Sequence, residues 1–251
     1  MTYSQIRVNS VDGVTTISFN RPDAMNAITL DMLEELKHAF EAAGKDASVN
    51  VVILTGEGRA FCAGLDLNAL GARTIAGGQV GDVLNGAARD LIILIETIPK
   101  VVIGRINGFC FTGGLEIVLA CDLIVVAEEA KLGDTHAKWG LRPSWGMSQR
   151  LPRAVGMANA HELSYTARTF TGAEAYAMGL ANRCAPLEEL DSAVSELTAS
   201  IVKNSQGSLA AYKDLFKAAQ STTLYQGLDY EFDTEYPIAD ADERLSSFTK
   251  K

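Results

Sequence analysis

The sequence predicts an α/β fold in which buried parallel strands alternate with helices. Three observations lead to this prediction: β-branched apolar runs at residues 49–55 and 101–106, helical apolar patterns in the segments between them, and glycine-containing turns directly after both runs. Apolar runs without alternation are typical of strands buried on both faces, and strands that alternate with helices form parallel sheets. With 251 residues, the chain is long enough to bury such a sheet in a sizeable core.

The first hundred residues contain the clearest local patterns. Residues 8–19 alternate apolar and polar positions around Asp12-Gly13, which predicts a hairpin with one buried face. Thr29 is placed to cap a helix whose apolar stripe ends at Gly44. A buried strand is predicted over residues 49–55, a helix over 83–98 and a second buried strand over 101–106.

The rest of the chain becomes progressively more helical. A short helix is predicted over residues 113–120 and a strand over 123–127, and strand patterns fade after about Gly156. Thr171 and Glu174 have the spacing of a capping box, and helical patterns continue to Phe216 and beyond. We therefore expect a catalytic core over residues 1–196 and a helical region over 197–251, which is either a packed appendage or an assembly surface.

Composition and charge narrow the class of protein. The chain is 47 % hydrophobic and 21 % charged, as in an ordinary globular protein, and its net charge of −9 disfavours nucleic-acid and anionic-membrane partners. The N-terminus lacks a signal-peptide pattern, and charged residues interrupt the most apolar stretches. Four widely spaced cysteines form no C-x-x-C pair, so they indicate neither a disulfide framework nor a zinc site. We expect a cytoplasmic protein with no membrane span and no metal ion.

Two glycine-containing turns carry the chemical signal. They are residues 58–66 (GRAFCAGLD) and 108–116 (GFCFTGGLE), and each follows a predicted buried strand. Unpaired N–H groups at such turns and at helix N-termini suit anions and developing oxyanions. Glu116 lies three residues after Gly113, so an acid/base group and an oxyanion donor would lie side by side. The alternative is that the glycines only form tight turns and that Glu116 complements the dipole of its own helix.

Other catalytic motifs are missing from the sequence. It contains no G-x-x-x-x-G-K-[ST] phosphate-binding loop, and the GEG at residues 56–58 lacks the third glycine of a dinucleotide fingerprint. Ser144, in the stretch RPSWG, does not stand in a G-x-S-x-G nucleophile turn.

Five motifs in order show that the chain resembles the crotonase superfamily, the enoyl-CoA hydratases and isomerases. They are residues 20–27 (NRPDAMNA), 61–66 (FCAGLD), 107–109 with 112–116 (NGF and TGGLE), 121–122 (CD) and 149–156 (QRLPRAVG), and together they span nearly the whole chain. The resemblance implies a spiral of ββα units whose C-terminal helices assemble a homotrimer or a homohexamer made of two trimers.

The resemblance also implies an acyl-CoA thioester substrate and its contacts. The backbone N–H groups of Leu65 and Gly113 match the family's oxyanion hole. Coenzyme A contacts fall on Arg21, Ala24, Ala63, Leu65, Asp66, Leu67 and Gly113. For Arg21, phosphate binding and a solvated loop arginine are both open. Lys213 or Lys217 is a candidate to reach a neighbouring subunit's ligand, although solvated helix faces are the simpler interpretation. Coenzyme A is part of the substrate, and no metal, flavin or nicotinamide is implied.

His136 marks a departure from the family pattern. The resemblance implies two glutamates that share the attacking water; the first matches Glu116, and the register of the flanking motifs places His136 at the second position. Three interpretations are open: Glu116 and His136 share the water, Glu116 acts alone while His136 shapes the acyl pocket, or the site has lost hydration. Asp134 is positioned to orient the imidazole, but we interpret it as an exposed loop aspartate. Trp139 and Trp145 are interpreted as packing residues, with lining of the acyl tunnel as the alternative for Trp139.

The sequence therefore predicts an enoyl-CoA hydratase that adds water to a trans-2-enoyl-CoA. Glu116 is the expected principal acid/base, and His136 stands for the second carboxylate. The alternatives are another reaction of the family, such as double-bond isomerisation, and a non-catalytic acyl-CoA-binding protein.

Overall fold

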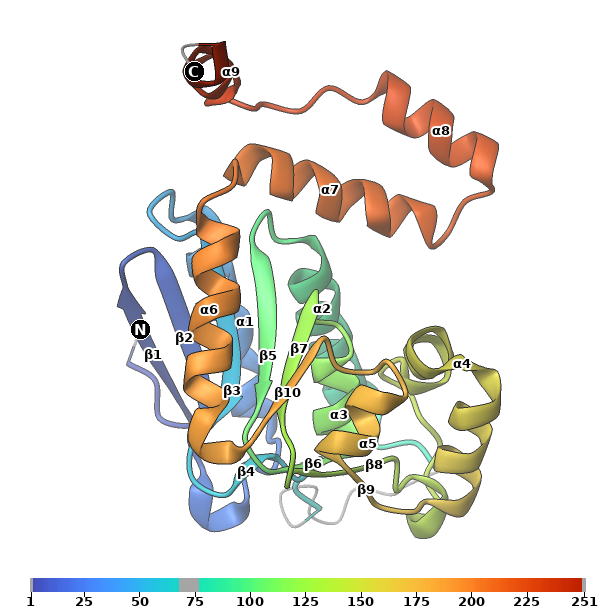
Figure 1. Cartoon of the computed structure of the whole chain (residues 1–251). Helices are drawn as coiled ribbons and strands as arrows, with labels where there is room; N and C mark the ends of the chain where they lie inside the picture. The colour runs from blue at the N-terminus through green and yellow to red at the C-terminus, as the bar shows by residue number, and fades with distance from the viewer. Residues whose placement is uncertain (1, 68–76, 250–251) are drawn as a thin grey trace.

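Two sheets form the framework of the computed structural model, which describes residues 2–67 and 77–249. The larger sheet has the strand order β1-β2-β3-β5-β7-β10, and the smaller has the order β4-β6-β8-β9. Figure 1 shows the smaller sheet crossing one end of the larger one. The strands of the larger sheet are β1 (Ile6–Val11), β2 (Val14–Phe19), β3 (Val51–Gly56), β5 (Val101–Ile106), β7 (Leu123–Ala127) and β10 (Arg183–Ala185). Those of the smaller sheet are β4 (Ala60–Cys62), β6 (Phe109–Phe111), β8 (Lys131–Gly133) and β9 (Phe170–Thr171).

The chain repeats a ββα unit whose two strands enter different sheets. The units are β3-β4-α2, β5-β6-α3 and β7-β8-α4, and the first strand of each lies in the larger sheet. The helices concerned are α2 (Asp82–Thr97), α3 (Gly113–Val118) and α4 (Met147–Thr166). This order is the spiral that the sequence resemblance implies. It places the N-terminus of α3 directly after β6, beside the end of β4.

The predicted strands and their parallel pairing are confirmed, with small shifts of their ends. β2, β3, β5, β7 and β10 pair in parallel, and all six residues of β3 are buried. The Asp12-Gly13 turn joins β1 and β2, and both turn residues have positive φ, as a tight hairpin turn requires. The expected buried face is wrong for β1, however. That strand lies at the edge of the sheet, and Ile6 is its only buried residue.

The N-terminal helix begins where predicted and ends one residue later. In α1 (Leu30–Lys45), the Thr29 side chain accepts a hydrogen bond from the Met32 N–H, as expected of an N-cap. Gly44 continues the helix instead of ending it, and Asp46 is the C-cap. α1 packs against β1 and β2, and α6 (Leu190–Val202) packs against β3, β7 and β10. Figure 1 shows these two helices on opposite faces of the larger sheet.

The C-terminal helices extend beyond the sheets. The capping box at Thr171 and Glu174 is confirmed at the start of α5 (Gly172–Ala177). The boundary expected between residues 196 and 197 lies within α6, which packs on the sheet. The helices that leave the sheet are α7 (Gln206–Ala219), α8 (Leu224–Asp233) and α9 (Ala241–Thr249), shown at one end of the molecule in Figure 1.

Lys213 fastens α7 to the core, so the interpretation of this residue as a solvated lysine is wrong. Its side chain is only 8 % exposed, and Nζ lies 2.7 Å from Asp122 Oδ2. The same amine donates to the carbonyl oxygens of Ile95 and Lys100. A buried ammonium needs such partners, because its desolvation is costly without them. Lys217, one turn later, is exposed as expected.

Candidate active site

The two glycine-containing turns meet between the sheets. Gly64 follows β4 with φ +95°, and a Cβ atom built there would lie 3.1 Å from Phe111 O and 3.6 Å from Gly113 N. Gly113 is packed as closely, since its Cβ would lie 2.7 Å from Cζ3 of Trp145. Gly64 is therefore required by close backbone approach and by its positive φ, and Gly113 by the indole ring packed against it.

The backbone N–H groups of Leu65 and Gly113 have no acceptor among the described residues. Ile28 pairs with Leu65 as an isolated parallel bridge, in which the Ile28 N–H donates to Gly64 O and the Asp66 N–H donates to Ile28 O. The N–H of Leu65 itself consequently points away from Ile28. Gly113 is the first residue of α3, where N–H groups have no partner within the helix. Within residues 2–67 and 77–249, neither N–H donates a hydrogen bond.

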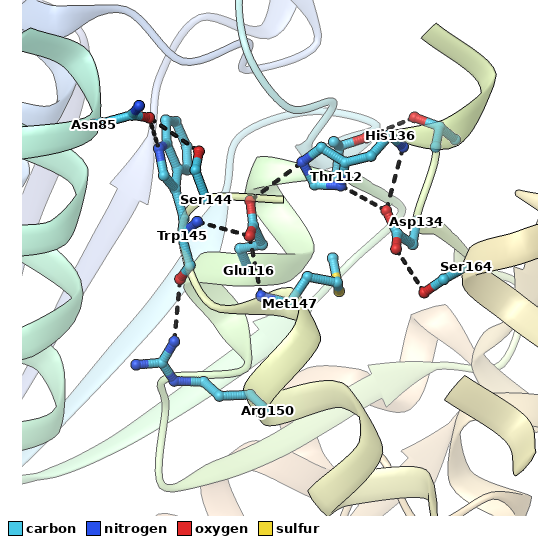
Figure 2. Close-up of polar contacts among 11 residues, drawn as sticks. Asn85, Thr112, Glu116, Asp134, His136, Ser144, Trp145, Met147, Arg150 and Ser164 are labelled. Carbon is cyan, nitrogen blue, oxygen red and sulfur yellow. Dashed lines mark hydrogen bonds and ion pairs between the residues drawn. The ribbon is translucent and has the colours of Figure 1, made fainter. Parts of the chain in front are cut away.

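Glu116 lies buried in the first turn of α3 with its two oxygens in different surroundings. Its Oε1 accepts hydrogen bonds from the N–H groups of Trp145 and Met147, both at 3.0 Å. Its Oε2 faces Nε2 of His136 at 3.5 Å (Figure 2). Burial raises the pKa of Glu116, although the nearby His136 and the two N–H donors oppose that rise. One oxygen thus anchors the carboxylate, and the other faces a second proton-carrying group.

His136 and Asp134 form the other half of the cluster. His136 Nδ1 lies 2.7 Å from Asp134 Oδ1, and the Ser164 hydroxyl donates to Asp134 Oδ2 at 2.7 Å. Asp134 is 3 % exposed, so its interpretation as an exposed loop aspartate is wrong. Burial favours a higher pKa for Asp134, but hydrogen bonds from His136 and Ser164 outweigh it and lower the pKa. No local pattern pointed to Ser164, because α4 brings it from 30 positions away.

The expected coenzyme A contacts other than Gly113, which begins α3, lie on two paired loops. The Ala63 N–H donates to Met25 O, which joins the loop after β2 to the loop after β4. Arg21 is no solvated loop arginine, because its Nη2 lies 2.9 Å from Asp66 Oδ2 and its Nη1 donates to Ala27 O. Leu67, the last residue described before the gap, is 48 % exposed. Ala24 lies in the 3-10 turn Pro22–Ala24. The structure thus brings these residues together on one pair of loops.

The two tryptophans differ in their surroundings. Trp145 is 5 % exposed, and its Nε1 donates to Asn85 Oδ1 on α2 at 2.9 Å (Figure 2). Its packing role is confirmed, and no sequence pattern indicated that its backbone N–H donates to Glu116. Trp139 is 61 % exposed, so packing is the wrong interpretation for it in this chain.

The remaining features of the described residues concern metal ligands, cysteines and membrane-spanning helices. Within residues 2–67 and 77–249, no group of three or more His, Cys, Asp or Glu side chains is placed to hold a metal ion. All four cysteines are free, and burial raises the pKa of the Cys62 thiol to about 12. In the same part of the chain, no helix has the length and apolar character needed to cross a membrane.

The chain combines a spiral of ββα units with a buried Glu116–His136 pair beside two glycine turns, and known proteins show to which family it belongs. A family model described as enoyl-CoA hydratase/isomerase matches residues 9–250. The chain belongs to this family, and its fold is the crotonase fold.

Similar proteins carry names from both branches of the family. A probable enoyl-CoA hydratase 1, peroxisomal, from Arabidopsis thaliana is 38 % identical over 219 residues, which cover 87 % of this chain and 80 % of that protein. A Delta(3,5)-Delta(2,4)-dienoyl-CoA isomerase, peroxisomal, from the same plant is 33 % identical, covering 90 % and 84 %. The crystal structure of an enoyl-CoA hydratase from Bacillus anthracis superposes with a TM-score of 0.90 at 33 % identity, covering 98 % and 96 %. These similarities support an enzyme of the crotonase type.

Proposed function

We propose that the protein is an enoyl-CoA hydratase that adds water to a trans-2-enoyl-CoA thioester. The observation that carries this proposal is the buried pair formed by Glu116 Oε2 and His136 Nε2, 3.5 Å apart. Two proton-carrying groups on one side of a substrate are what addition of water across a double bond needs, since one proton leaves the water and another reaches carbon.

The unpaired N–H groups of Leu65 and Gly113 are the proposed oxyanion hole. They would donate to the thioester carbonyl oxygen, where negative charge develops as the enolate forms. One well-placed donor of this kind is worth about 3 kcal/mol, or roughly 10²- to 10³-fold in rate. Because both donors belong to the main chain, a side-chain change at Leu65 tests the shape of the pocket and not the donor.

The proton transfers are assigned as follows. Glu116 Oε2 takes a proton from water while the water oxygen bonds to Cβ of the enoyl group and the π electrons move to the carbonyl oxygen. His136 Nε2 then gives its proton to Cα as the enolate collapses. Return of a proton from Glu116 to His136 restores the site, so that one water has been added. Because Glu116 acts as a base, turnover falls as pH drops through its raised pKa.

Coenzyme A is proposed to bind along the paired loops that carry Arg21, Ala24, Ala63, Leu65, Asp66 and Leu67. In a chain of net charge −9, phosphate groups need a local cation, and Arg21 supplies one at these loops. Asp66 already neutralises part of that charge. Lys213 is occupied in the core, which leaves Lys217 as the candidate that reaches a neighbouring subunit's ligand.

We propose that residues 197–251 assemble the protein into a homotrimer or homohexamer in the cytoplasm. Helices α7, α8 and α9 expose large apolar side chains, among them Phe216 at 63 %, Tyr225 at 78 %, Phe232 at 91 % and Phe248 at 80 %. Such surfaces mark interaction sites, because exposure of grouped apolar residues to water is unfavourable. Phe232→Ser is expected to lower the mass found by light scattering, and an unchanged mass would exclude α8 from the interface.

Crotonyl-CoA provides the direct test. Loss of the enoyl-thioester absorbance is followed for wild type, Glu116→Gln, His136→Gln and the control Glu34→Gln on the exposed face of α1. We expect hydration by wild type and the control, and a loss of about 10²- to 10⁴-fold in kcat for the two site variants. The glutamine at position 116 keeps an oxygen for the two N–H donors, so ligand affinity should persist. Binding without turnover of short or long enoyl-CoA thioesters would refute the proposal.

Double-bond isomerisation is the second candidate, favoured by the similarity to a dienoyl-CoA isomerase. The same pair could move a proton between two carbons without adding water. Supplying a 3-enoyl-CoA distinguishes the two reactions, because isomerisation produces the enoyl-thioester absorbance whereas hydration removes it. A protein that binds both substrates and converts neither is a non-catalytic acyl-CoA-binding member of the family.

A further inference from the structure

We infer that Asp134, held by Ser164 of α4, is a positioning residue that fixes the ring orientation and tautomer of His136 for proton transfer with Glu116. The inference rests on the proposed function, and it assigns a task to two residues that do not face the reacting atoms.

The geometry fixes which ring nitrogen carries a proton toward Asp134. Asp134 Oδ1 lies 2.7 Å from His136 Nδ1 and also accepts from the His136 backbone N–H at 3.3 Å. A carboxylate accepts and does not donate, so Nδ1 bears hydrogen. Nε2 is then the nitrogen that faces Glu116 Oε2 at 3.5 Å (Figure 2). Without Asp134, nothing among these contacts prevents the ring from rotating or from carrying its hydrogen on Nε2 alone.

The second oxygen of Asp134 is held from another element. The Ser164 hydroxyl donates to Oδ2 at 2.7 Å, so the carboxylate is fixed at both ends between the 134–136 segment and α4. The Asp134 side chain is only 4 % exposed and that of His136 is 10 % exposed. Water therefore competes little for these hydrogen bonds, and their geometry is better defined than at an exposed site.

The groups around His136 agree with this assignment. The titratable groups that face it are Asp134 on its own segment and Glu116 on α3, and Ser164, which contacts Asp134 from α4, is uncharged. Because Asp134 accepts the Nδ1 hydrogen, Nε2 is the nitrogen left to exchange a proton with Glu116. Loss of the Asp134 carboxylate should therefore leave the ring without a fixed nitrogen for that exchange.

Two substitutions test the hydrogen bonds of Asp134. Asp134→Asn keeps an oxygen for Nδ1–H and an amide that Ser164 can accept from. Asp134→Ala removes both. We expect Asp134→Asn to lower kcat less than Asp134→Ala does, with little change in KM. Asp134→Ala should lower kcat by about 10²- to 10⁴-fold, as loss of a group that fixes a catalytic histidine does elsewhere. Ser164→Ala should lower kcat less than Asp134→Ala.

A matched control removes the same kind of contact elsewhere. Ser205 donates to Asp240 at 2.5 Å next to α7, and Ser205→Ala should leave kcat unchanged. Wild-type kcat in Asp134→Ala would overturn the inference while leaving the hydratase proposal intact.

A measurement that does not depend on turnover keeps the two proposals apart. The chain has three histidines, so the ring nitrogen signals of His136 can be assigned by comparison with His136→Gln in ¹⁵N NMR. We expect wild type to show hydrogen on Nδ1 and Asp134→Ala to lose that preference. If wild type hydrates no enoyl-CoA but shows this pattern, the hydratase proposal fails and the positioning stands. If Asp134→Ala retains the wild-type ring signals, the positioning fails.

Discussion

Replacing Gly113 by alanine would place a methyl group against Trp145. The new Cβ would lie 2.7 Å from Cζ3 and 3.2 Å from Cε3 of the indole. Ordinary contacts begin at 3.4 Å, so the ring must retreat by about 0.7 Å. The ring has little freedom to do so, because Asn85 holds its Nε1 and the backbone of Trp145 holds Glu116.

The cost can be bounded from these contacts. Overpacking of a filled site typically costs about 1–3 kcal/mol of stability, which lowers the Tm of a chain of this size by roughly 2–4 °C per kcal/mol. The effect on turnover should be larger. A displaced Gly113 N–H loses its proposed alignment with the thioester oxygen. The lost transition-state stabilisation is about 3 kcal/mol, which lowers kcat roughly 10²- to 10³-fold.

The assay compares kcat with crotonyl-CoA and Tm by calorimetry for Gly113→Ala and for Gly86→Ala. Gly86 lies in α2 with no atom within 4 Å of the built Cβ, so its variant should keep both values or gain slightly in stability. Trp145→Phe removes the atoms that clash, and in that background the added cost of Gly113→Ala should shrink. A Gly113→Ala protein with kcat within threefold of wild type would refute the reasoning.

Three further predictions concern stability. Lys213→Ala should lower the free energy of unfolding in urea by about 1.5–3 kcal/mol, because it removes the ion pair with Asp122 and the two carbonyl hydrogen bonds made by the buried ammonium. Glu35 accepts hydrogen bonds from residues 4–6, which outweigh the effect of burial and lower its pKa. Glu35→Gln should therefore cost about 1.5–3 kcal/mol at pH 7, and the difference should narrow as pH falls through that lowered pKa and wild type becomes protonated. Gly44→Ala should add up to about 1 kcal/mol, measured in the same way, because Gly44 is helical and the new Cβ meets Ile98 at an ordinary 3.4 Å.

The residues alone predicted the longer elements and missed the shortest ones. β3 and β5 follow from β-branched runs, and Thr29 identifies the start of α1. β4, β6 and β8 have three residues each, too few to show alternation. In the sequence, β4 and β6 look like parts of glycine-containing turns. The ββα order was predicted only from the family resemblance. The predicted end of α1 at Gly44 was wrong for a related reason. A helix tolerates a glycine near its end when the next residues continue the pattern.

Prediction of the candidate site was limited in the same way, because local sequence patterns do not show burial or contacts between distant residues. Glu116 and Gly113 were found because their spacing within one helical turn is local. Asp134 was misjudged because a sequence shows that a residue is polar but not whether it is buried. Ser164 was missed because its relation to Asp134 exists only after α4 has packed beside the 133–136 segment.

That segment also supports the turn on which the proposed oxyanion hole depends. Thr112, a β-branched residue with φ +49° and ψ −110°, adopts a backbone conformation that costs energy and persists only where neighbours hold it. Its N–H donates to Gly133 O at 2.9 Å, and its hydroxyl lies 2.6 Å from the Thr135 hydroxyl. The peptide that follows Thr112 carries the Gly113 N–H. Residues 133–136 therefore hold both the turn that aims this N–H and the histidine that faces Glu116, so a displacement of the segment would disturb oxyanion binding and proton transfer together.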